Sequence, residues 1–480
     1  MTSNRWRMGF HLMPPTGWVN DPNGLCYFNG LYHVFHQYSP DWPHGSERGW
    51  GHATSPDLVH WTHHGMVIHQ DVPEDANGAY SGSAYIVPGG AADGGDLLRL
   101  YYTGNVKEPG DHDYIRSGRQ GNQLLIESAD GFALGEKNVL LRNADYPGFC
   151  SCHVRDPKVW SQDERLHMLL GARDLDDEGL ALILESNDGI TWNIASTVRP
   201  TSHFGFMWEC PDRIALDGFE YLSLCPQGME ELPWANGLRD QSGYIALPAS
   251  VKLISCERVN PALFRRWDFG FDFYAPQTFT DPQGRTILIG WMGLPEPPFE
   301  SAPDNLDWIH CLTVPRVLTR CEDGAIAQEP VPELEQLRGE QVPLAQAPLA
   351  QADDAQADTL ASTLPAHRAD IAIDGITGPF KLTLDGDASI SFADGVLTLA
   401  FDGGAQGIGR GRKERSISVD ALENLRVLVD SSALEIFANN GREVFSTRWF
   451  PTTDQLDIAI QGTVATASVW TMGDGMADTY

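Results

Sequence analysis

Short apolar segments separated by turn residues dominate the first 330 residues of the chain. They are 4 to 8 residues long and rich in Leu, Ile, Tyr and Phe, and they lie at 25–28, 31–38, 97–104, 166–172, 180–186, 220–226 and 286–292. Segments of this length, without long helical periodicity between them, predict β-strands. The Asn29-Gly30 pair between the first two segments is a strong hairpin signal. The pattern therefore predicts an all-β fold.

The pattern changes at about Pro332. A short helical stretch at 332–338 and an Ala/Gln/Asp-rich connector at 345–362 come first. After residue 370 the apolar and polar positions alternate, at 380–386, 388–401, 425–439 and 443–450, which is typical of a β-sandwich. We therefore expect a first domain at 1–333, a linker at 334–369 and a β-sandwich domain at 370–480.

A repeat of five units runs through the first domain. Each unit opens with a polar or acidic motif, followed by a strand, a turn and a second strand, and the units start at Asp21, Ser81, Asp156, Glu209 and Ala275. Their intervals are 60, 75, 53 and 66 residues. Units of this length fit four-stranded sheets repeated around an axis. The sequence thus predicts an N-terminal five-bladed β-propeller followed by a C-terminal β-sandwich, with the unit starts around one end of the central channel.

Three of the five unit starts are carboxylates: Asp21, Asp156 and Glu209. Enzymes cut a glycosidic bond with two carboxyl groups, of which one attacks the anomeric carbon and the other donates a proton. Asp21 stands among amide donors that can hold it ionised, whereas the apolar neighbours of Glu209 in the sequence favour a protonated acid. Asp156 follows Arg155, whose charge favours the ionised form and a role in holding substrate hydroxyls.

Each of these residues also has a purely structural interpretation. Asp and Asn before Pro or Gly are ordinary turn formers, so an isolated Asp-Pro pair is best read as scaffold. Three acids at matching repeat positions favour a site. Cys150, Cys152 and His153 form the one cluster of metal-ligand residue types, but no second ligand pair accompanies it. We therefore expect no metal ion and no organic cofactor.

Composition narrows the function classes. Lys and Arg number 33 against 65 Asp and Glu, which gives a formal charge of −32. Such a chain repels phosphate backbones and anionic lipid, so nucleic-acid and membrane-surface binding are poor candidates. No apolar run reaches membrane-spanning length, no secretory signal opens the chain, and the eight Cys are scattered. We expect a cytoplasmic protein whose partner is a small-molecule sugar, and leave a homo-oligomer open.

Seven short sequence motifs follow one another along the chain in a characteristic order. They are WVNDPNG at 18–24, WGHATSPDLVHW at 50–61, YSGSA at 80–84, RDPKVW at 155–160, WECPD at 208–212, DFYAPQ at 272–277 and ALEIFAN at 433–439. Through them the chain resembles glycoside hydrolase family 32, the β-fructofuranosidases. The resemblance implies a propeller and a sandwich, and retaining hydrolysis of a terminal β-D-fructofuranosyl linkage in sucrose, sucrose 6-phosphate or short fructo-oligosaccharides. A fructosyltransferase, a glycosidase acting on arabinose-type furanosides and a carbohydrate-binding propeller without catalysis are the alternatives.

The resemblance also implies residue roles. Asp21 would be the nucleophile, Asp156 the transition-state stabiliser and Glu209 the acid/base. Cys210, beside the acid, would tune it. The positions that match the family's fructosyl-binding residues are Asn20, Gln37, Trp42, Tyr80, Ser81, Arg155 and Trp291.

A cluster of basic residues follows the YTG motif at 102–104. Lys107, Arg116 and Arg119 lie together there and could contact a substrate phosphate or simply face solvent.

Overall fold

The computed structural model describes residues 4–45, 47–229, 237–304, 306–347, 359–404 and 407–479. In this part of the chain the strands form seven sheets, and helical segments are limited to short 3-10 turns. These turns are Asn4–Trp6, Pro73–Asp75, Asn143–Asp145, Leu253–Ser255, Pro261–Leu263 and Pro332–Leu337. The predicted all-β fold is confirmed. Among the described residues no helix is long and apolar enough to span a membrane.

Five sheets come from the first 330 residues, and each is built mostly from strands that are consecutive in sequence. The first has the order β20-β1-β2-β3-β4, with β20 (Trp308–Ile309), β1 (Gly17–Phe28), β2 (Leu31–Ser39), β3 (Gly49–Ser55) and β4 (Thr62–Ile68). The second runs β5 (Ala79–Val87), β6 (Leu97–Lys107), β7 (Arg119–Ser128) and β8 (Asn138–Leu141). The third has the order β16-β12-β11-β10-β9, with β9 (Cys150–Gln162), β10 (Arg165–Asp174), β11 (Gly179–Ser186), β12 (Asn193–Pro200) and β16 (Arg258–Val259).

The remaining two of these sheets are smaller. The fourth runs β13 (Met207–Leu216), β14 (Phe219–Gln227), β15 (Gly243–Ala246) and β17 (Phe264–Arg266). The fifth runs β18 (Tyr274–Thr280), β19 (Thr286–Trp291), β21 (Arg316–Arg320) and β22 (Ile326–Pro330). The late strand β20 pairs in parallel with β1, so the end of this region returns to its beginning.

Each predicted unit start falls on the first strand of a different sheet. These strands are β1, β5, β9, β13 and β18, and each contacts the next, while β18 also contacts β1. The pairing of each with its neighbour is interrupted at the predicted unit start, between Val19 and Pro22, Ala79 and Gly82, Arg155 and Lys158, Glu209 and Asp212, and Tyr274 and Gln277. Because a β-bulge frees residues from the ladder and re-aims their side chains, five bulges at equivalent positions can direct side chains from five sheets to one place.

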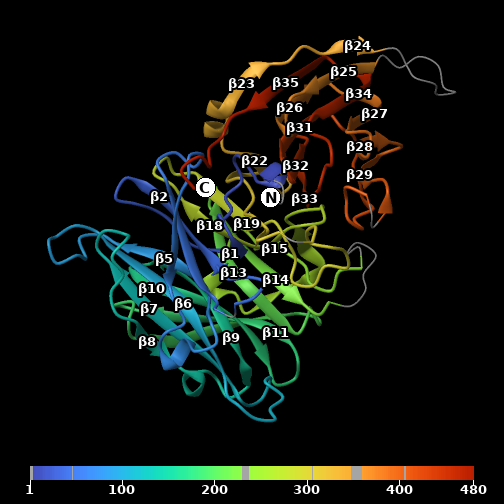
Figure 1. Cartoon of the computed structure of the whole chain (residues 1–480). Helices are drawn as coiled ribbons and strands as arrows, with labels where there is room; N and C mark the ends of the chain where they lie inside the picture. The colour runs from blue at the N-terminus through green and yellow to red at the C-terminus, as the bar shows by residue number, and fades with distance from the viewer. Residues whose placement is uncertain are drawn as a thin grey trace.

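The other two sheets come from the C-terminal part and are drawn in orange to red in Figure 1. One has the order β23-β35-β26-β31-β32-β33, with β23 (Arg338–Gln341), β26 (Arg368–Asp374), β31 (Asn424–Asp430), β32 (Ala433–Ala438), β33 (Glu443–Arg448) and β35 (Thr466–Met472). The other has the order β24-β25-β34-β27-β28-β29-β30, with β24 (Ala345–Ala347), β25 (Thr359–Leu364), β27 (Thr377–Leu384), β28 (Ala388–Ala393), β29 (Val396–Phe401), β30 (Glu414–Ser418) and β34 (Leu456–Thr463). One apolar core, which includes Ile371, Leu382 and Val427, is shared by both sheets.

The segment expected as a linker, 334–369, is in large part built into these sheets. Strand β23 pairs with β35, β24 pairs with β25, and β25 pairs with β34. At these three strands the segment therefore extends existing sheets, despite its Ala- and Gln-rich composition. Residues 348–358 lie outside the described part.

A buried charge cluster joins the N-terminal segment to the C-terminal sheets. His11 Nδ1 lies 2.9 Å from Asp430 Oδ2, and His11 Nε2 lies 2.9 Å from Glu435 Oε1. Arg316 Nε donates to the other oxygen of Glu435 at 3.0 Å. Burial alone would lower the pKa of His11, but the hydrogen bonds and charges of Asp430 and Glu435 raise it to about 9. A buried imidazolium thus holds the two parts of the chain together.

Candidate active site

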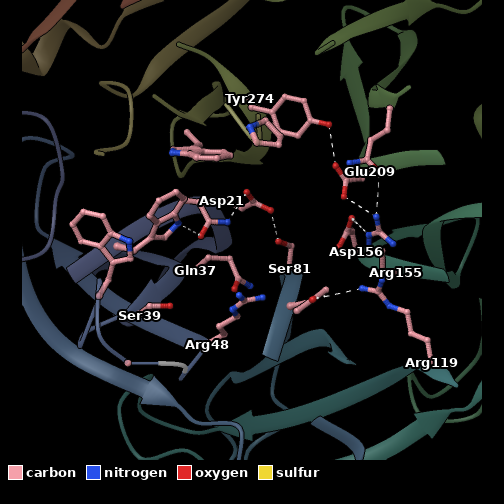
Figure 2. A pocket seen from close by; sticks show the side chains of 18 residues that line it. Asp21, Gln37, Ser39, Arg48, Ser81, Arg119, Arg155, Asp156, Glu209 and Tyr274 are labelled. Carbon is pink, nitrogen blue, oxygen red and sulfur yellow. Dashed lines mark hydrogen bonds and ion pairs between the residues drawn. The ribbon is translucent and has the colours of Figure 1, made fainter. Parts of the chain in front are cut away.

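The five bulged strands surround a cavity of about 540 Å³. All ten residues predicted from the sequence line it: Asn20, Asp21, Gln37, Trp42, Tyr80, Ser81, Arg155, Asp156, Glu209 and Trp291. The wall also contains eight residues that the prediction did not include as fructosyl contacts: Trp18, Ser39, Gly45, Arg48, Arg119, Gln227, Tyr274 and Pro295. Figure 2 shows Asp21 facing the same space as Glu209 and Asp156, from different strands.

Asp21 is held by three donors. Ser81 Oγ donates to Oδ2 at 2.6 Å, and Asn20 Nδ2 donates to Oδ1 at 3.0 Å, which is the amide contact expected from the sequence. The Cys210 thiol lies 3.5 Å from Oδ2. Burial raises the pKa of Asp21 above its ordinary value, and the charge of Glu209 adds to this, while the hydrogen bonds oppose it. These donors fix both oxygens of the carboxylate.

Trp18 orients the amide that serves Asp21. Its Nε1–H donates to Asn20 Oδ1 at 2.9 Å, so the NH₂ group of Asn20 is the end that faces Asp21. The prediction missed Trp18, although it opens the WVNDPNG motif, because a Trp in this position reads equally well as core packing.

Glu209 meets polar partners rather than the apolar surroundings expected from the sequence. Arg155 Nη2 donates to Oε1 at 2.7 Å, and Tyr274 Oη donates to Oε2 at 2.9 Å (Figure 2). Adjacent residues on a strand point to opposite faces, so Trp208 does not share the surroundings of the carboxylate. Trp208, the preceding residue, packs into the core behind the site. Tyr274 was missed as a site residue, although it belongs to the DFYAPQ motif of the fifth unit.

Asp156 differs from its predicted state. Burial raises its pKa to about 7, and the charges of Glu209 and Asp21 contribute, although Arg155 opposes the shift. Arg155 Nε lies 3.9 Å from Asp156 Oδ2, beyond hydrogen-bond distance, because the guanidinium is bound to Glu209 instead. The charge of Arg155 thus favours the ionised form of Asp156, as expected, but burial outweighs it.

Backbone geometry at two bulges places the acids. Asp156 has φ of 66° and Cys210 has φ of 44°, a region that non-glycine residues seldom adopt. The Asp156 N–H donates to Thr103 Oγ1 at 2.9 Å, which supports this conformation. Such backbone strain is typical of functional sites, where the surrounding structure enforces it.

Cys210 contacts two of the three acids, Asp21 and Asp156, rather than its chain neighbour Glu209. Its backbone N–H donates to Asp156 Oδ2 at 2.9 Å, and its thiol lies against Asp21. Burial raises the pKa of the Cys210 thiol well above its ordinary value, and the nearby carboxylates add to the shift. The thiol is therefore neutral and can serve as a hydrogen-bond donor. Cys210 thus contacts Asp21 and Asp156, and its tuning of Glu209 stays a prediction.

Of the three basic residues considered for phosphate, only Arg119 lines the cavity. Arg119 Nε donates to Asn105 Oδ1 at 2.9 Å, and its guanidinium lies 5.8 Å from the centre of the Tyr80 ring. Arg116 instead donates to the Leu175 carbonyl at 3.0 Å. Lys107 is exposed, and its ammonium group lies 5.9 Å from the centre of the Tyr114 ring.

Arg48 is a second cation in the wall that the prediction missed. It is exposed, and within the described part of the chain its guanidinium makes no hydrogen bond or ion pair. It lies two residues before the WGHATSPDLVHW motif, in a loop whose sequence carries no periodic signal. The cavity therefore has two guanidinium groups, those of Arg48 and Arg119, in addition to the Arg155 that is bound to Glu209.

The cluster Cys150, Cys152 and His153 does not form a metal site. His153 Nε2 bonds to the Tyr114 carbonyl at 3.0 Å, and its Nδ1 lies 2.9 Å from Arg155 Nη1. Over the described residues, no group of three or more His, Cys, Asp and Glu side chains is arranged to bind a metal.

Comparisons with known proteins agree with this geometry. The family model "Glycosyl hydrolases family 32 N-terminal domain" matches residues 11–330, and "Glycosyl hydrolases family 32 C terminal" matches residues 334–471. The chain is 34% identical to a sucrose-6-phosphate hydrolase of Bacillus subtilis, over 98% of this chain and 95% of the relative. It is 32% identical to a raffinose invertase of Escherichia coli, over 95% and 92% of the two chains.

Comparison with solved structures supports the same family. The sucrose-6-phosphate hydrolase from Lactobacillus gasseri is similar with a TM-score of 0.83 and 28% identity, covering 98% of this chain and 94% of that one. Both domain families thus match in sequence order, and the similarity extends over almost the whole length. The protein belongs to glycoside hydrolase family 32.

Proposed function

We propose that the protein is a retaining β-fructofuranosidase that hydrolyses sucrose-type substrates by double displacement. The observation that carries the proposal is the convergence of Asp21, Asp156 and Glu209 in one cavity, each with different partners. Two carboxyl groups with separate roles are what glycoside hydrolysis requires. The invertases and sucrose-6-phosphate hydrolases among its relatives support the choice of fructosyl substrates.

In the first step Asp21 attacks the anomeric carbon of the fructosyl unit. The bond from that carbon to the leaving oxygen breaks, and Glu209 gives its proton to this oxygen, so a covalent ester on Asp21 and a free sugar result. In the second step Glu209 removes a proton from water, which attacks the anomeric carbon and releases Asp21 and fructose. Two inversions give net retention.

The charge that develops on the fructosyl ring is stabilised by Asp156, which also accepts from substrate hydroxyls. Burial raises the pKa of Asp156 to about 7, so Asp156 gains the negative charge for this role as pH rises through 7.

The proposed fructosyl contacts are the seven other residues predicted from the sequence, Asn20, Gln37, Trp42, Tyr80, Ser81, Arg155 and Trp291. Support comes from their position in the cavity wall. Aromatic rings such as those of Trp42 and Trp291 supply apolar surface for a sugar face, and the amides and hydroxyl supply donors.

The architecture we propose for this activity is a five-bladed β-propeller at about 1–333 followed by a β-sandwich domain. The cycle of contacts among β1, β5, β9, β13 and β18 supports five blades around a central axis. The match of the C-terminal family from residue 334, together with the strands β23 to β25, supports a sandwich that begins before residue 370. Cytoplasmic location and a homo-oligomeric state stay predictions.

The test of the proposed function is Asp21→Asn together with a product analysis. The amide cannot form the glycosyl ester, so sucrose hydrolysis should fall by at least about 1,000-fold while the fold is kept. NMR during hydrolysis by the parent enzyme should show β-fructofuranose as the first product. A variant with a tenth of the parent rate, or α-fructofuranose as the first product, would contradict the mechanism. Activity should survive exhaustive chelation, since acids and water complete the chemistry.

Arg48 and Arg119 favour sucrose 6-phosphate over sucrose within this function. The cavity contains three carboxyl groups, which would repel a phosphate dianion unless cations lay near it. A free guanidinium is suited to a phosphate, which it can bind through two parallel hydrogen bonds. Arg48→Gln should lower the ratio of kcat/KM for sucrose 6-phosphate over sucrose by about tenfold. The matched control Arg116→Gln, on the neighbouring loop surface, should keep the parent ratio.

The amounts of glucose and fructose released from sucrose distinguish a hydrolase from a fructosyltransferase and from a carbohydrate-binding propeller without catalysis. A fructosyltransferase would release glucose faster than fructose at high sucrose, because the fructosyl ester passes to a second sugar. A carbohydrate-binding propeller would release neither sugar. Hydrolysis predicts equal amounts of both.

A further inference from the structure

The chain segment that leads into the catalytic strand β18 is bound to the C-terminal sheets. The Phe269 N–H donates to the Val444 carbonyl at 2.8 Å, and the Phe271 N–H donates to the Ser446 carbonyl at 2.9 Å. A Cβ atom on Gly270 would lie 2.1 Å from the Ser446 carbonyl oxygen, so only glycine permits this close approach. Residues 269–271 thus run along β33 immediately before the chain enters the active site.

Asp272, the next residue, is fixed by a buried arginine of the C-terminal part. Arg412 donates to both carboxylate oxygens, from Nη2 to Oδ1 and from Nε to Oδ2, each at 2.7 Å. The Arg448 backbone N–H donates to Oδ2 as well, at 2.9 Å. Both side chains of the pair are almost fully excluded from solvent. Burial opposes ionisation, but these donors hold the pKa of Asp272 below its ordinary value.

Tyr274 stands two residues further along and reaches the catalytic acid. It begins β18, pairs with Trp291, and donates its hydroxyl hydrogen to Glu209 Oε2. The following residue, Ala275, has φ of 47°, so the strand is already bulged at this point and depends on its surroundings for its exact path. A displacement of Asp272 would therefore be passed to the Tyr274 hydroxyl within two residues of rigid backbone.

We propose that Arg412 is a positioning residue for catalysis, which holds Tyr274 against Glu209 by clamping Asp272. The C-terminal sheets then take part in the reaction, although none of their residues lines the cavity. This inference rests on the proposed role of Glu209 as the acid/base. A bidentate arginine pair suits the task because its two parallel bonds fix the direction of the carboxylate as well as its distance.

The experiment compares Arg412→Gln, Arg412→Lys and Tyr274→Phe with their double variants, on sucrose and on an activated aryl β-fructofuranoside. Tyr274→Phe removes the hydrogen bond to Glu209 Oε2 and should lower kcat on sucrose by about 10- to 100-fold. Arg412→Gln should lower it similarly. Both should lower kcat on the aryl substrate much less, since its leaving oxygen needs little protonation. Arg412→Gln combined with Tyr274→Phe should be no slower than the slower single variant.

The matched control is Arg338→Gln, which breaks a pair with Asp370 inside the C-terminal sheets. It should lower thermal stability without changing the ratio of rates on the two substrates. Equal losses on both substrates for folded Arg412→Gln, or losses that multiply in the double variant, would overturn the proposal. Arg412→Lys keeps the charge without the paired bonds, should show the same substrate dependence, and decides the question where the Gln variant does not fold.

Glu209→Gln separates this inference from the proposed function. If Glu209→Gln loses far more rate on sucrose than on the aryl substrate while Arg412→Gln does not, only the role of Arg412 is wrong. If Glu209→Gln itself shows no such difference, the proposed function of Glu209 fails first.

Discussion

Arg155 donates to Glu209 at 2.7 Å, although the two residues are 54 positions apart in the sequence. This contact takes the guanidinium away from Asp156, its chain neighbour, which remains 3.9 Å distant. The charge of Arg155 therefore lies closer to Glu209 than to Asp156. Burial raises the pKa of Asp156 to about 7, although Arg155 opposes the shift.

Asp156→Asn should make the protein more stable at high pH. The folded pKa of Asp156 is raised from 3.8 to about 7, so the parent loses stability as pH rises from about 4 through 7. Asn cannot ionise, keeps an acceptor for the Cys210 N–H, and tolerates the positive φ. At pH 8 the Tm of the variant should exceed that of the parent by roughly 2–5 °C. At pH 4 the two should agree, and a variant that is less stable at pH 8 would contradict the raised pKa.

His11→Gln should weaken the junction between the two parts of the chain in a pH-dependent manner. The folded pKa of His11 is raised from 6.5 to about 9, so its stabilisation is complete below pH 6.5 and is lost as pH rises through 9. Removing the imidazolium leaves two buried carboxylates without their shared partner. The Tm should fall by roughly 3–8 °C at pH 6. The difference from the parent should shrink above pH 9, and a difference that grows there would refute the assignment.

Trp18→Phe should lower kcat while it keeps an aromatic ring in the cavity wall. The change removes the donor to Asn20 Oδ1, so the amide can turn its oxygen toward Asp21. The loss of one oriented hydrogen bond predicts a fall in kcat on sucrose of about tenfold. Trp160→Phe, whose indole nitrogen bonds only within the third sheet to Gln162, is the matched control and should keep the parent kcat. An unchanged kcat for Trp18→Phe would show that Asn20 needs no such support.

Much of the fold could be predicted because turn signals and short apolar segments are local. The unit starts at Asp21, Ser81 and Asp156 coincide with bulges on the first strands of separate sheets, since the polar motif and the following hairpin are both written in consecutive residues. The strands β23 and β24 could not be predicted, because they have no apolar alternation of their own and pair with strands more than 10 positions away.

The candidate site also has features that local sequence motifs predict and features that depend on contacts between distant residues. Its carboxylates could be found from the sequence because they stand in repeated motifs. The partners of those carboxylates could not, because the bond from Arg155 to Glu209 and that from Tyr274 to Glu209 depend on how separate sheets meet. Arg48 was missed for a related reason: an exposed arginine in a loop has no pattern that distinguishes it from a solvated surface residue.

If Glu209 is the general acid, Glu209→Gln removes the proton that the leaving oxygen of sucrose needs. Gln keeps the size of the side chain but cannot donate the catalytic proton, so kcat on sucrose should fall by about 10²–10⁴-fold. An activated aryl β-fructofuranoside should lose far less, because its leaving oxygen departs without protonation. An equal fall in kcat on both substrates would show that Glu209 is not the general acid. Asp156, whose pKa of about 7 also allows it to carry a proton, would then be the acid to test.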